Sequence, residues 1–362
     1  MKIGILTHYQ VHNHGAILQM YGLYYTLKSF NHTPYILTYQ KNFDFIPKEL
    51  STKYNLSFKS IPFYFQYVKK QGIFKTLFNF NKHKILKSFK SNYYDFQSLK
   101  ESNMDFVVIG SDEVFSLEVG CNKMMYGYGI PCKNIFSYAP AFGQTNIDII
   151  KKTGCFELIQ SGLKTFKAIS VRDIYASDTV EQLTGIKPTV VCDPVFLYGF
   201  EKEMTVTCNK IPKNKYLLIY AYDNNMNDLE EIAIIKKYAK NNNLVIVSGG
   251  YYHKWADINI NVNPIELISL FKNATCIITD TFHGSVLAIL TNRPFASFVR
   301  QMNINKMTYL LDCFGVLPSK MAKWEELSKI LDYQHNWDIV NKCIFEQREI
   351  GMNYLKKVLT NE

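Results

Sequence analysis

Short apolar runs alternate with helix-like segments in both halves of this chain, and this alternation limits the possible fold more than any other feature. Each run is long enough for one β-strand and ends in a polar or glycine-containing turn. Such alternation favours a parallel sheet covered by helices on both faces. We expect strands at 2–6, 34–39, 106–109, 134–138, 168–171, 189–192, 216–220, 244–247, 276–279 and 295–299. Helices are expected at 16–30, 227–240, 264–271, 286–290 and 337–359.

The chain has 362 residues, more than a single hydrophobic core usually supports, so two domains are expected. A polar, lysine-rich stretch at 199–215, which contains Pro212, is the predicted linker. We therefore predict two consecutive doubly wound, Rossmann-like α/β domains at 1–200 and 213–335. The remaining segment, 336–362, is predicted to form a long helix that closes over both domains.

The composition is that of a globular protein, with 47% hydrophobic and 20% charged residues. No uninterrupted apolar run approaches the ~20 residues needed to cross a bilayer. The chain starts directly with a predicted strand, without the charged, apolar and small-residue regions of a signal peptide. We therefore expect a cytoplasmic protein.

The eight cysteines are scattered and include no Cys-x-x-Cys pair, so the sequence predicts neither a zinc site nor a disulfide framework. Several of them lie in apolar runs, where a thiol acts as a small hydrophobic side chain. No group of His, Asp and Glu residues has the spacing of metal ligands. We expect no metal and no bound cofactor.

The net charge of +10 is unevenly spread, and a basic, aromatic insertion is predicted at 44–103. Eleven lysines but only two acidic residues lie between positions 46 and 100, interleaved with aromatic side chains. Such a segment suits an anionic surface, whether membrane headgroups, a polyanionic glycan or nucleic acid. Alternatively, the aromatic residues pack inward while the lysines face water. No recognisable nucleic-acid-binding module is present, so we expect no nucleic-acid partner.

The strand at 276–279 runs directly into Asp280-Thr281-Phe282-His283-Gly284-Ser285, and this turn is the best indication of function. A strand that stops and restarts as a helix leaves unpaired N–H groups, which can bind an anion. His283 can donate to that anion or transfer a proton near neutral pH, and Gly284 allows close approach to the backbone. Alternatively, His283 only caps its own helix.

Polar turns also follow the other predicted strands, where ligands bind in open α/β sheets. Six such segments, in this order, resemble elements of the polysaccharide pyruvyl transferase family. They are Asn13-His14-Gly15-Ala16-Ile17-Leu18-Gln19, Gly110-Ser111-Asp112-Glu113-Val114-Phe115, Ser137-Tyr138-Ala139-Pro140-Ala141-Phe142-Gly143, Ser170-Val171-Arg172-Asp173, Cys192-Asp193-Pro194 and Asp280-Thr281-Phe282-His283-Gly284.

The resemblance implies a GT-B-like fold, in which two Rossmann-like domains face each other across a cleft. It also implies transfer of pyruvate from phosphoenolpyruvate, as co-substrate, to sugar hydroxyls of a cell-surface polysaccharide or its lipid-linked precursor, with formation of a ketal. A lipid-linked acceptor suits the membrane hypothesis, in which the segment 58–96 docks on the inner membrane face through its lysines and through Phe63, Phe65 or Phe74.

The donor carries a carboxylate and a phosphate, so its site needs two cationic or N–H-rich groups. Arg172 is one candidate, and the N–H groups of Gly284 and Ser285 are the other. His283 is the candidate acid that protonates the methylene carbon, and Asp280 is expected to orient its ring or raise its pKa.

The acceptor is expected against the first domain, at the turn with Asn13, His14 and Gly15 and near Tyr138. Asp112 is a candidate base for a sugar hydroxyl, although aspartate often caps a helix instead. Asn13 and Gly15 can equally serve only to shape their turn.

The sequence departs from the family at two positions. Thr281 stands where many relatives have arginine, and Lys306 lies in Asn-Lys-Met where relatives often have Asn-Ser-Arg. Lys306 can still bind the donor, as a point charge without the planar fork of arginine. Two rivals stay open: a GT-B glycosyltransferase that uses a nucleotide sugar, with Glu266 as its candidate ribose ligand, and a non-catalytic glycan-binding relative.

Overall fold

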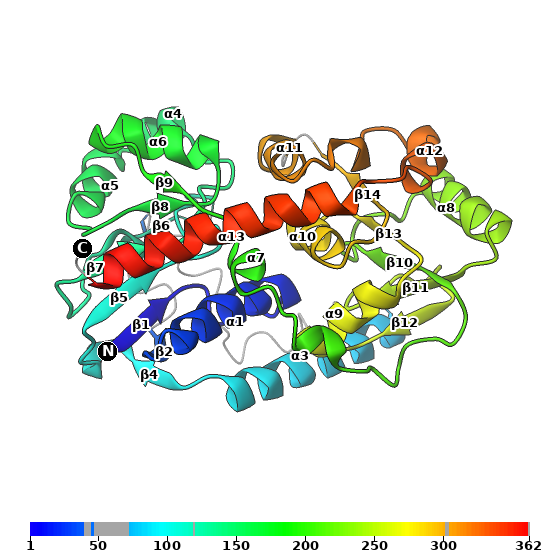
Figure 1. Ribbon diagram of the computed structural model, residues 1–362, viewed down its shortest axis with the longest axis horizontal. Helices are drawn as coiled ribbons and strands as arrows, with labels where there is room; N and C mark the ends of the chain where they lie inside the picture. The colour runs from blue at the N-terminus through cyan, green and yellow to red at the C-terminus, as the bar shows by residue number, and fades with distance from the viewer. Residues whose placement is uncertain (40–44, 47–71, 119, 301–303, 361–362) are drawn as a thin grey trace.

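Two parallel β-sheets, one in each half of the chain, form the frame of the molecule (Figure 1). The computed structural model describes residues 1–39, 45–46, 72–118, 120–300 and 304–360. The first sheet has the strand order β4-β2-β1-β5-β7. Its strands are β1 (Lys2–Leu6), β2 (Thr33–Thr38), β4 (Phe96–Ser98), β5 (Phe106–Ile109) and β7 (Ile135–Ser137).

The first half contains two further, two-stranded sheets. The pair β8 (Ser170–Val171) and β9 (Thr189–Val190) is parallel and follows β7 through a bridge between Phe136 and Ala168. The pair β3 (Phe45–Ile46) and β6 (Cys121–Asn122) is antiparallel. The helices of this half are α1 (His14–Ser29), α3 (Ile73–Tyr93), α4 (Ile147–Lys152), α5 (Phe156–Leu163), α6 (Ile174–Thr184) and α7 (Pro194–Tyr198).

The second sheet has the order β12-β11-β10-β13-β14-β15, which is the 3-2-1-4-5-6 order of a Rossmann fold. Its strands are β10 (Tyr216–Tyr220), β11 (Val245–Gly249), β12 (Ile258–Ile260), β13 (Cys276–Thr279), β14 (Phe295–Phe298) and β15 (Lys320–Met321). The helices are α8 (Leu229–Asn241), α9 (Pro264–Asn273), α10 (Phe282–Leu290), α11 (Ile304–Cys313) and α12 (Leu327–Leu331). Single 3-10 turns lie at Leu99–Glu101, Lys123–Tyr126, Glu203–Thr205, Leu317–Ser319 and Trp324–Glu326.

Each sheet reverses its strand order at a switch point, between β1 and β5 in the first sheet and between β10 and β13 in the second. All these strands are parallel, so their carboxyl ends share one edge of each sheet. Open α/β sheets bind ligands at such points. The turns at Asp112 and at His283 follow β5 and β13, and the two switch points line one common cavity.

The two halves share one large hydrophobic core, to which α1, α7 and α9 contribute. Gly22 of α1 lies so close to α7 that a Cβ there would collide with the carbonyl of Pro194. His14, at the start of α1, lies 2.9 Å through Nε2 from the carbonyl oxygen of Val262. The contact of His14 with Val262 joins the first domain directly to the second.

The long C-terminal helix α13 (Trp337–Thr360) crosses the molecule from the second half to the first (Figure 1). Tyr354 donates to the carbonyl oxygen of Ser137 at 2.9 Å, and Arg348 donates to that of Phe196 at 3.0 Å. The predicted long C-terminal helix is therefore confirmed, and these two contacts attach it to the first half.

The insertion contains α3, which runs along one side of the molecule toward β12 (Figure 1). Lys75 of α3 pairs with Asp223 at 3.0 Å, and Asn261 donates to the carbonyl oxygen of Phe78 at 2.7 Å. The helix therefore also connects the two halves. Phe74 and Phe80 are 72% and 69% exposed, so the inward packing that we considered for the aromatic residues fails at these two positions. The predicted membrane-facing residues Phe63 and Phe65 lie outside the described residues.

Candidate active site

A cavity of about 120 Å³ lies where the switch points of the two sheets face each other. It is lined by Asn13, Ala16, Asp112, Glu113, Arg172, Tyr220, Tyr222, Tyr251, Asp280, Thr281, Phe282, His283 and Lys306. Six residues that the sequence nominated are thus brought together: Asn13, Asp112, Arg172, Asp280, His283 and Lys306.

His283 lies in the first turn of α10 but does not cap this helix. The cap is Thr281, whose Oγ1 accepts from the N–H of Gly284 at 2.9 Å. The interpretation of His283 as a cap is therefore wrong. The imidazole Nε2 lies 3.6 Å from Oδ2 of Asp193, and Gly15 packs so closely on the ring that a Cβ there would collide with it.

Asp193 is the carboxylate beside His283. It is buried, and its Oδ2 also lies 3.5 Å from the Arg172 guanidinium. Burial by itself raises the pKa of Asp193, but the neighbouring His283 and Arg172 outweigh burial, so this pKa lies below its ordinary value. Asp193 therefore stays ionised beside the imidazole of His283. Sequence analysis identified its Asp-Pro step but not this role.

Asp280, which we expected to orient His283, faces a different set of partners. Its carboxylate accepts from the Tyr222 N–H at 3.2 Å and from the Asn225 side chain, and it lies 3.6 Å from Arg300 Nε. Burial raises the pKa of Asp280, and these neighbours offset only part of that rise. The predicted pairing of Asp280 with His283 is wrong, because Asp193 occupies that place.

Arg172 lies at the carboxyl end of β8, as predicted, and its guanidinium is 4.1 Å from the ring centre of Phe282. Its side chain is only 4% exposed, and Nε has no hydrogen-bond partner among the described residues. A buried guanidinium that contacts one carboxylate only at 3.5 Å keeps donors for a further anion.

Lys306 of α11 and Glu113 form an ion pair across the cavity, which joins α11 to the first domain. Asp112 has a backbone φ of +81°, and its Oδ1 accepts from the adjacent Glu113 N–H at 2.9 Å. No α-helix begins at this aspartate, so the alternative of a helix cap is wrong.

Three of the four residues expected to bind the acceptor do not line this cavity. Asn13 does, while its Oδ1 caps α1 by accepting from the Gly15 N–H at 2.8 Å. His14 and Tyr138 are fully buried, the first against Val262 and the second beneath Gly351 of α13. Gly15 lies behind the imidazole of His283.

The prediction that the N–H groups of Gly284 and Ser285 bind the donor is also wrong. The Gly284 N–H is bound by the Thr281 side chain, and the Ser285 N–H donates to the Thr281 carbonyl oxygen at 3.2 Å. The Ser285 hydroxyl is buried and donates to Ser297 at 2.9 Å. Both N–H groups thus have partners within the chain, because threonine at position 281 is a good helix cap.

Sequence analysis missed three tyrosines in the cavity: Tyr220, Tyr222 and Tyr251. Burial, followed by the charges of Asp280, Asp112 and Glu113, raises the pKa of Tyr222 to about 12. This phenol is therefore neutral near pH 7 and able to donate. Tyr220 ends β10 and Tyr222 follows it. Ligands bind at the carboxyl ends of such strands, but we predicted no site residue at this one.

In the described part of the chain, no helix is long and apolar enough to span a membrane. No group of three or more His, Cys, Asp or Glu side chains there is arranged to hold a metal ion.

Comparison with solved structures places this architecture among GT-B proteins. The chain is similar to the UDP-GlcNAc 2-epimerase of Methanocaldococcus jannaschii, with 16% identity, a TM-score of 0.56 and 100% of both chains covered. It is also similar to a putative UDP-N-acetylglucosamine 2-epimerase of Listeria monocytogenes, with 10% identity, a TM-score of 0.57, and 99% and 96% of the two chains covered. At these identities the likeness shows the fold alone.

Comparison with curated proteins gives no match. The family model for polysaccharide pyruvyl transferases, however, matches residues 13–301. The matched segment spans both domains and holds every residue of the cavity except Lys306, which lies shortly beyond it. The chain therefore belongs to the polysaccharide pyruvyl transferase family.

Proposed function

We propose that the protein transfers pyruvate from phosphoenolpyruvate to two hydroxyls of a saccharide and releases inorganic phosphate. The observation that carries this proposal is the group of Arg172, His283 and Asp193 at one small cavity. Arg172 and Lys306 are the fixed positive charges that line it. A small donor with a carboxylate and a phosphate suits such a site.

In this mechanism His283, which lies beside the carboxylate of Asp193, gives a proton to the methylene carbon of the donor. The central carbon becomes electrophilic, and the first sugar hydroxyl adds to it and loses its proton. The phosphate then leaves with the C–O bonding pair, and the second hydroxyl adds to the same carbon. The proton of this second hydroxyl leaves with the phosphate. The π bond of C=C, one C–O bond and two sugar O–H bonds are broken, while one C–H bond, two C–O bonds and one phosphate O–H bond form. The proton of the first hydroxyl replaces the one that His283 gave.

Each charged residue has a role in this scheme. Arg172 binds an anionic group of the donor with the guanidinium donors that Asp193 leaves unused. Lys306 provides a point charge on the opposite domain. Asp112 accepts the proton of a sugar hydroxyl from the first domain.

The alternative function, a glycosyltransferase that uses a nucleotide sugar, lacks the ribose ligand that the sequence predicted. Glu266 caps α9, where its carboxylate accepts from the Asn263 N–H at 2.8 Å, and it lies 3.6 Å from Lys210. It does not line the cavity. The non-catalytic rival rested on Thr281 and Lys306, yet Thr281 caps the functional turn and Lys306 keeps a cation in the cavity.

Isothermal titration of the wild-type protein with phosphoenolpyruvate and with a panel of nucleotide sugars tests the donor. We expect phosphoenolpyruvate to bind, and we expect Arg348→Lys, a change on α13 away from the cavity, to leave its affinity unchanged. Binding of a nucleotide sugar without binding of phosphoenolpyruvate would favour the glycosyltransferase. Binding of neither donor would favour a non-catalytic glycan-binding protein.

We also place the reaction in the cytoplasm, with a lipid-linked acceptor at the inner membrane face. This part of the proposal is supported by the exposed phenylalanines of α3 and by the exposed Lys84 and Lys87 on the same helix. Basic and apolar side chains together suit an anionic lipid surface.

A further inference from the structure

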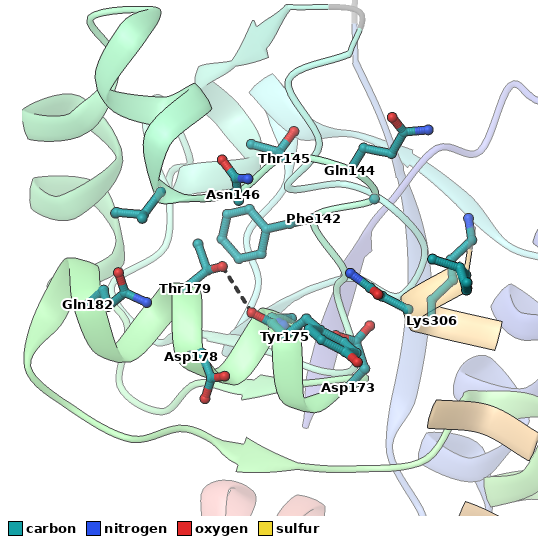
Figure 2. A pocket seen from close by; sticks show the side chains of 15 residues that line it. Phe142, Gln144, Thr145, Asn146, Asp173, Tyr175, Asp178, Thr179, Gln182 and Lys306 are labelled. Carbon is teal, nitrogen blue, oxygen red and sulfur yellow. Dashed lines mark hydrogen bonds between the residues drawn. The ribbon is translucent and has the colours of Figure 1, made fainter. Parts of the chain in front are cut away.

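A second cavity, of about 330 Å³, lies beside the candidate active site. Three segments border it: the loop at 142–147, the first turns of α6, and the start of α11 (Figure 2). The predicted acceptor residues include none of its lining residues. It is larger than the donor cavity and has no role in the mechanism above.

The lining of this cavity combines aromatic rings with amides, hydroxyls and carboxylates. Tyr175 and Phe142 provide the rings (Figure 2), and Tyr175 is 43% exposed. The side chains of Gln144, Asp178 and Gln182 make no hydrogen bond to another side chain or backbone group among the described residues. An amide offers both donors and acceptors, and a carboxylate accepts, so together they match hydroxyl groups, which do both.

The lining suits an uncharged ligand that carries hydroxyl groups. Two carboxylates, Asp173 and Asp178, line the cavity together with one ammonium group, that of Lys306, which is paired with Glu113. A neutral polyol with one apolar face suits both the amides and the exposed ring.

The two cavities are neighbours. Lys306 lines both of them, and Asp173 of the second cavity directly follows Arg172 of the first. A molecule held in the second cavity therefore lies next to the cavity that contains Arg172.

We propose that this second cavity binds the acceptor saccharide, with a sugar face on the ring of Tyr175 and hydroxyls on Gln144, Asp178 and Gln182. The role of this saccharide as acceptor rests on the proposed function. Binding of the saccharide to the cavity does not require the donor. The acceptor site is therefore assigned to the side of α6 that faces the loop at 142–147 and α11, and not to the turn at Asn13.

The test is saturation-transfer NMR with the methyl glycosides of galactose, glucose, mannose and N-acetylglucosamine, together with titration of phosphoenolpyruvate. We expect at least one glycoside to bind the wild-type protein. Tyr175→Ala should weaken that binding about tenfold and Gln182→Ala several-fold, because a stacking face or a hydrogen-bonding amide is lost. Tyr175→Phe, which keeps the ring, should retain most of the affinity.

The matched control is Glu181→Ala, since Glu181 is the exposed neighbour of Gln182 on α6 and does not line the cavity. All four variants should bind phosphoenolpyruvate within about twofold of wild type. Failure of every glycoside to bind, or equal binding by wild type and Tyr175→Ala, would overturn the acceptor site. Tyr175-dependent sugar binding without binding of phosphoenolpyruvate would retain the saccharide site and reject the proposed donor.

Discussion

At the scale of single residues, the charged side chains beside His283 come from the first domain, although His283 itself belongs to the second. His283 belongs to α10 of the second half, whereas Asp193 and Arg172 follow strands of the first half. A proton donor beside a buried carboxylate and a buried guanidinium can act only while the two halves are assembled. The close packing of Gly15, in the first half, on the ring of His283 is one of the contacts that such assembly makes.

Asp193→Asn tests which carboxylate supports His283. The change keeps the shape of the side chain but removes the negative charge beside the proposed acid His283, so kcat should fall about 10- to 100-fold. The matched variant Asp280→Asn alters a carboxylate that contacts Asn225 and Arg300 instead, and its kcat should fall much less. Steady-state kinetics and thermal unfolding of both variants make the comparison. A larger loss of kcat in Asp280→Asn than in Asp193→Asn would support the pairing of Asp280 with His283 that the sequence predicted.

Arg172→Lys tests the donor contact. Lysine keeps the charge but loses the planar fork, at a cost of about 1.5–3 kcal/mol for one charge-assisted hydrogen bond. KM for phosphoenolpyruvate should therefore rise roughly 10- to 100-fold, whereas Arg348→Lys on α13 should leave it unchanged. An unaltered KM in Arg172→Lys would assign this arginine to a structural ion pair with Asp193.

His14 predicts a pH dependence of stability. Burial, and to a smaller extent the charge of Lys82, lowers the pKa of His14 to about 3. Between pH 6.5 and 3 the unfolded chain therefore binds a proton that the folded protein does not, so stability falls as the pH falls. From pH 7 to pH 5 His14 should remove about 2 kcal/mol from the free energy of unfolding.

Urea unfolding at pH 7 and pH 5 checks this expectation. His14→Asn should show a smaller loss of stability on acidification than wild type, and His83→Asn, at an exposed position of α3, should behave as wild type does. Equal losses in wild type and His14→Asn would mean that His14 is accessible to water, and its predicted role at the acceptor would then regain support.

At the scale of elements, long apolar strands were predictable and short ones were not. The bounds of β1, β5, β10 and β13 agree with the sequence analysis, because each is an almost continuous apolar run between polar turns. The sequence analysis missed β3, β4, β6, β12 and β15. Each of these strands has two or three residues, and β4, β12 and β15 lie at sheet edges, so pairing with a neighbour defines them more than their own composition does.

Helix starts were misplaced for a related reason. The helix α10 begins at Phe282 rather than at 286, because Thr281 caps it and the first turn carries the functional residues. Sequence analysis placed His283 in a loop before the helix, and this produced the wrong assignment of Gly284 and Ser285 as free donors. The contact between His283 and Asp193 joins distant positions, so no local pattern reveals it.

The helix α3 yields a prediction about membranes. The protein should sediment with anionic vesicles at low salt and less so at high salt, since lysines near such a surface contribute about 1 kcal/mol each. Exchange of Lys84 and Lys87 for glutamine should weaken this attachment, and Phe74→Ser should remove the part that resists salt. The control exchanges the exposed pair Lys236 and Lys237 of α8 for glutamine. Equal recovery in the supernatant with anionic and neutral vesicles would remove the membrane proposal.

At the scale of the whole molecule, two Rossmann-like sheets place their switch points against one cavity, and α13 crosses the molecule from the second half to the first (Figure 1). The fold class followed from the alternation of strands and helices. Which faces of the domains meet did not follow from it, because the contacts of α1 with α9 depend on side chains distant in sequence. Tyr138 was wrongly expected at the acceptor site for the same reason: α13, which is distant in sequence, covers its side chain.

The central claim is that His283 passes a proton to phosphoenolpyruvate while the saccharide receives the pyruvyl group. The direct measurement follows isotope-labelled phosphoenolpyruvate into the acceptor by mass spectrometry, with parallel measurement of released phosphate. The account predicts label in the saccharide with one phosphate released per ketal, and a rate about two to four orders of magnitude lower in a folded His283→Ala variant. Transfer at the wild-type rate by His283→Ala, or phosphate release without label in the saccharide, would contradict it.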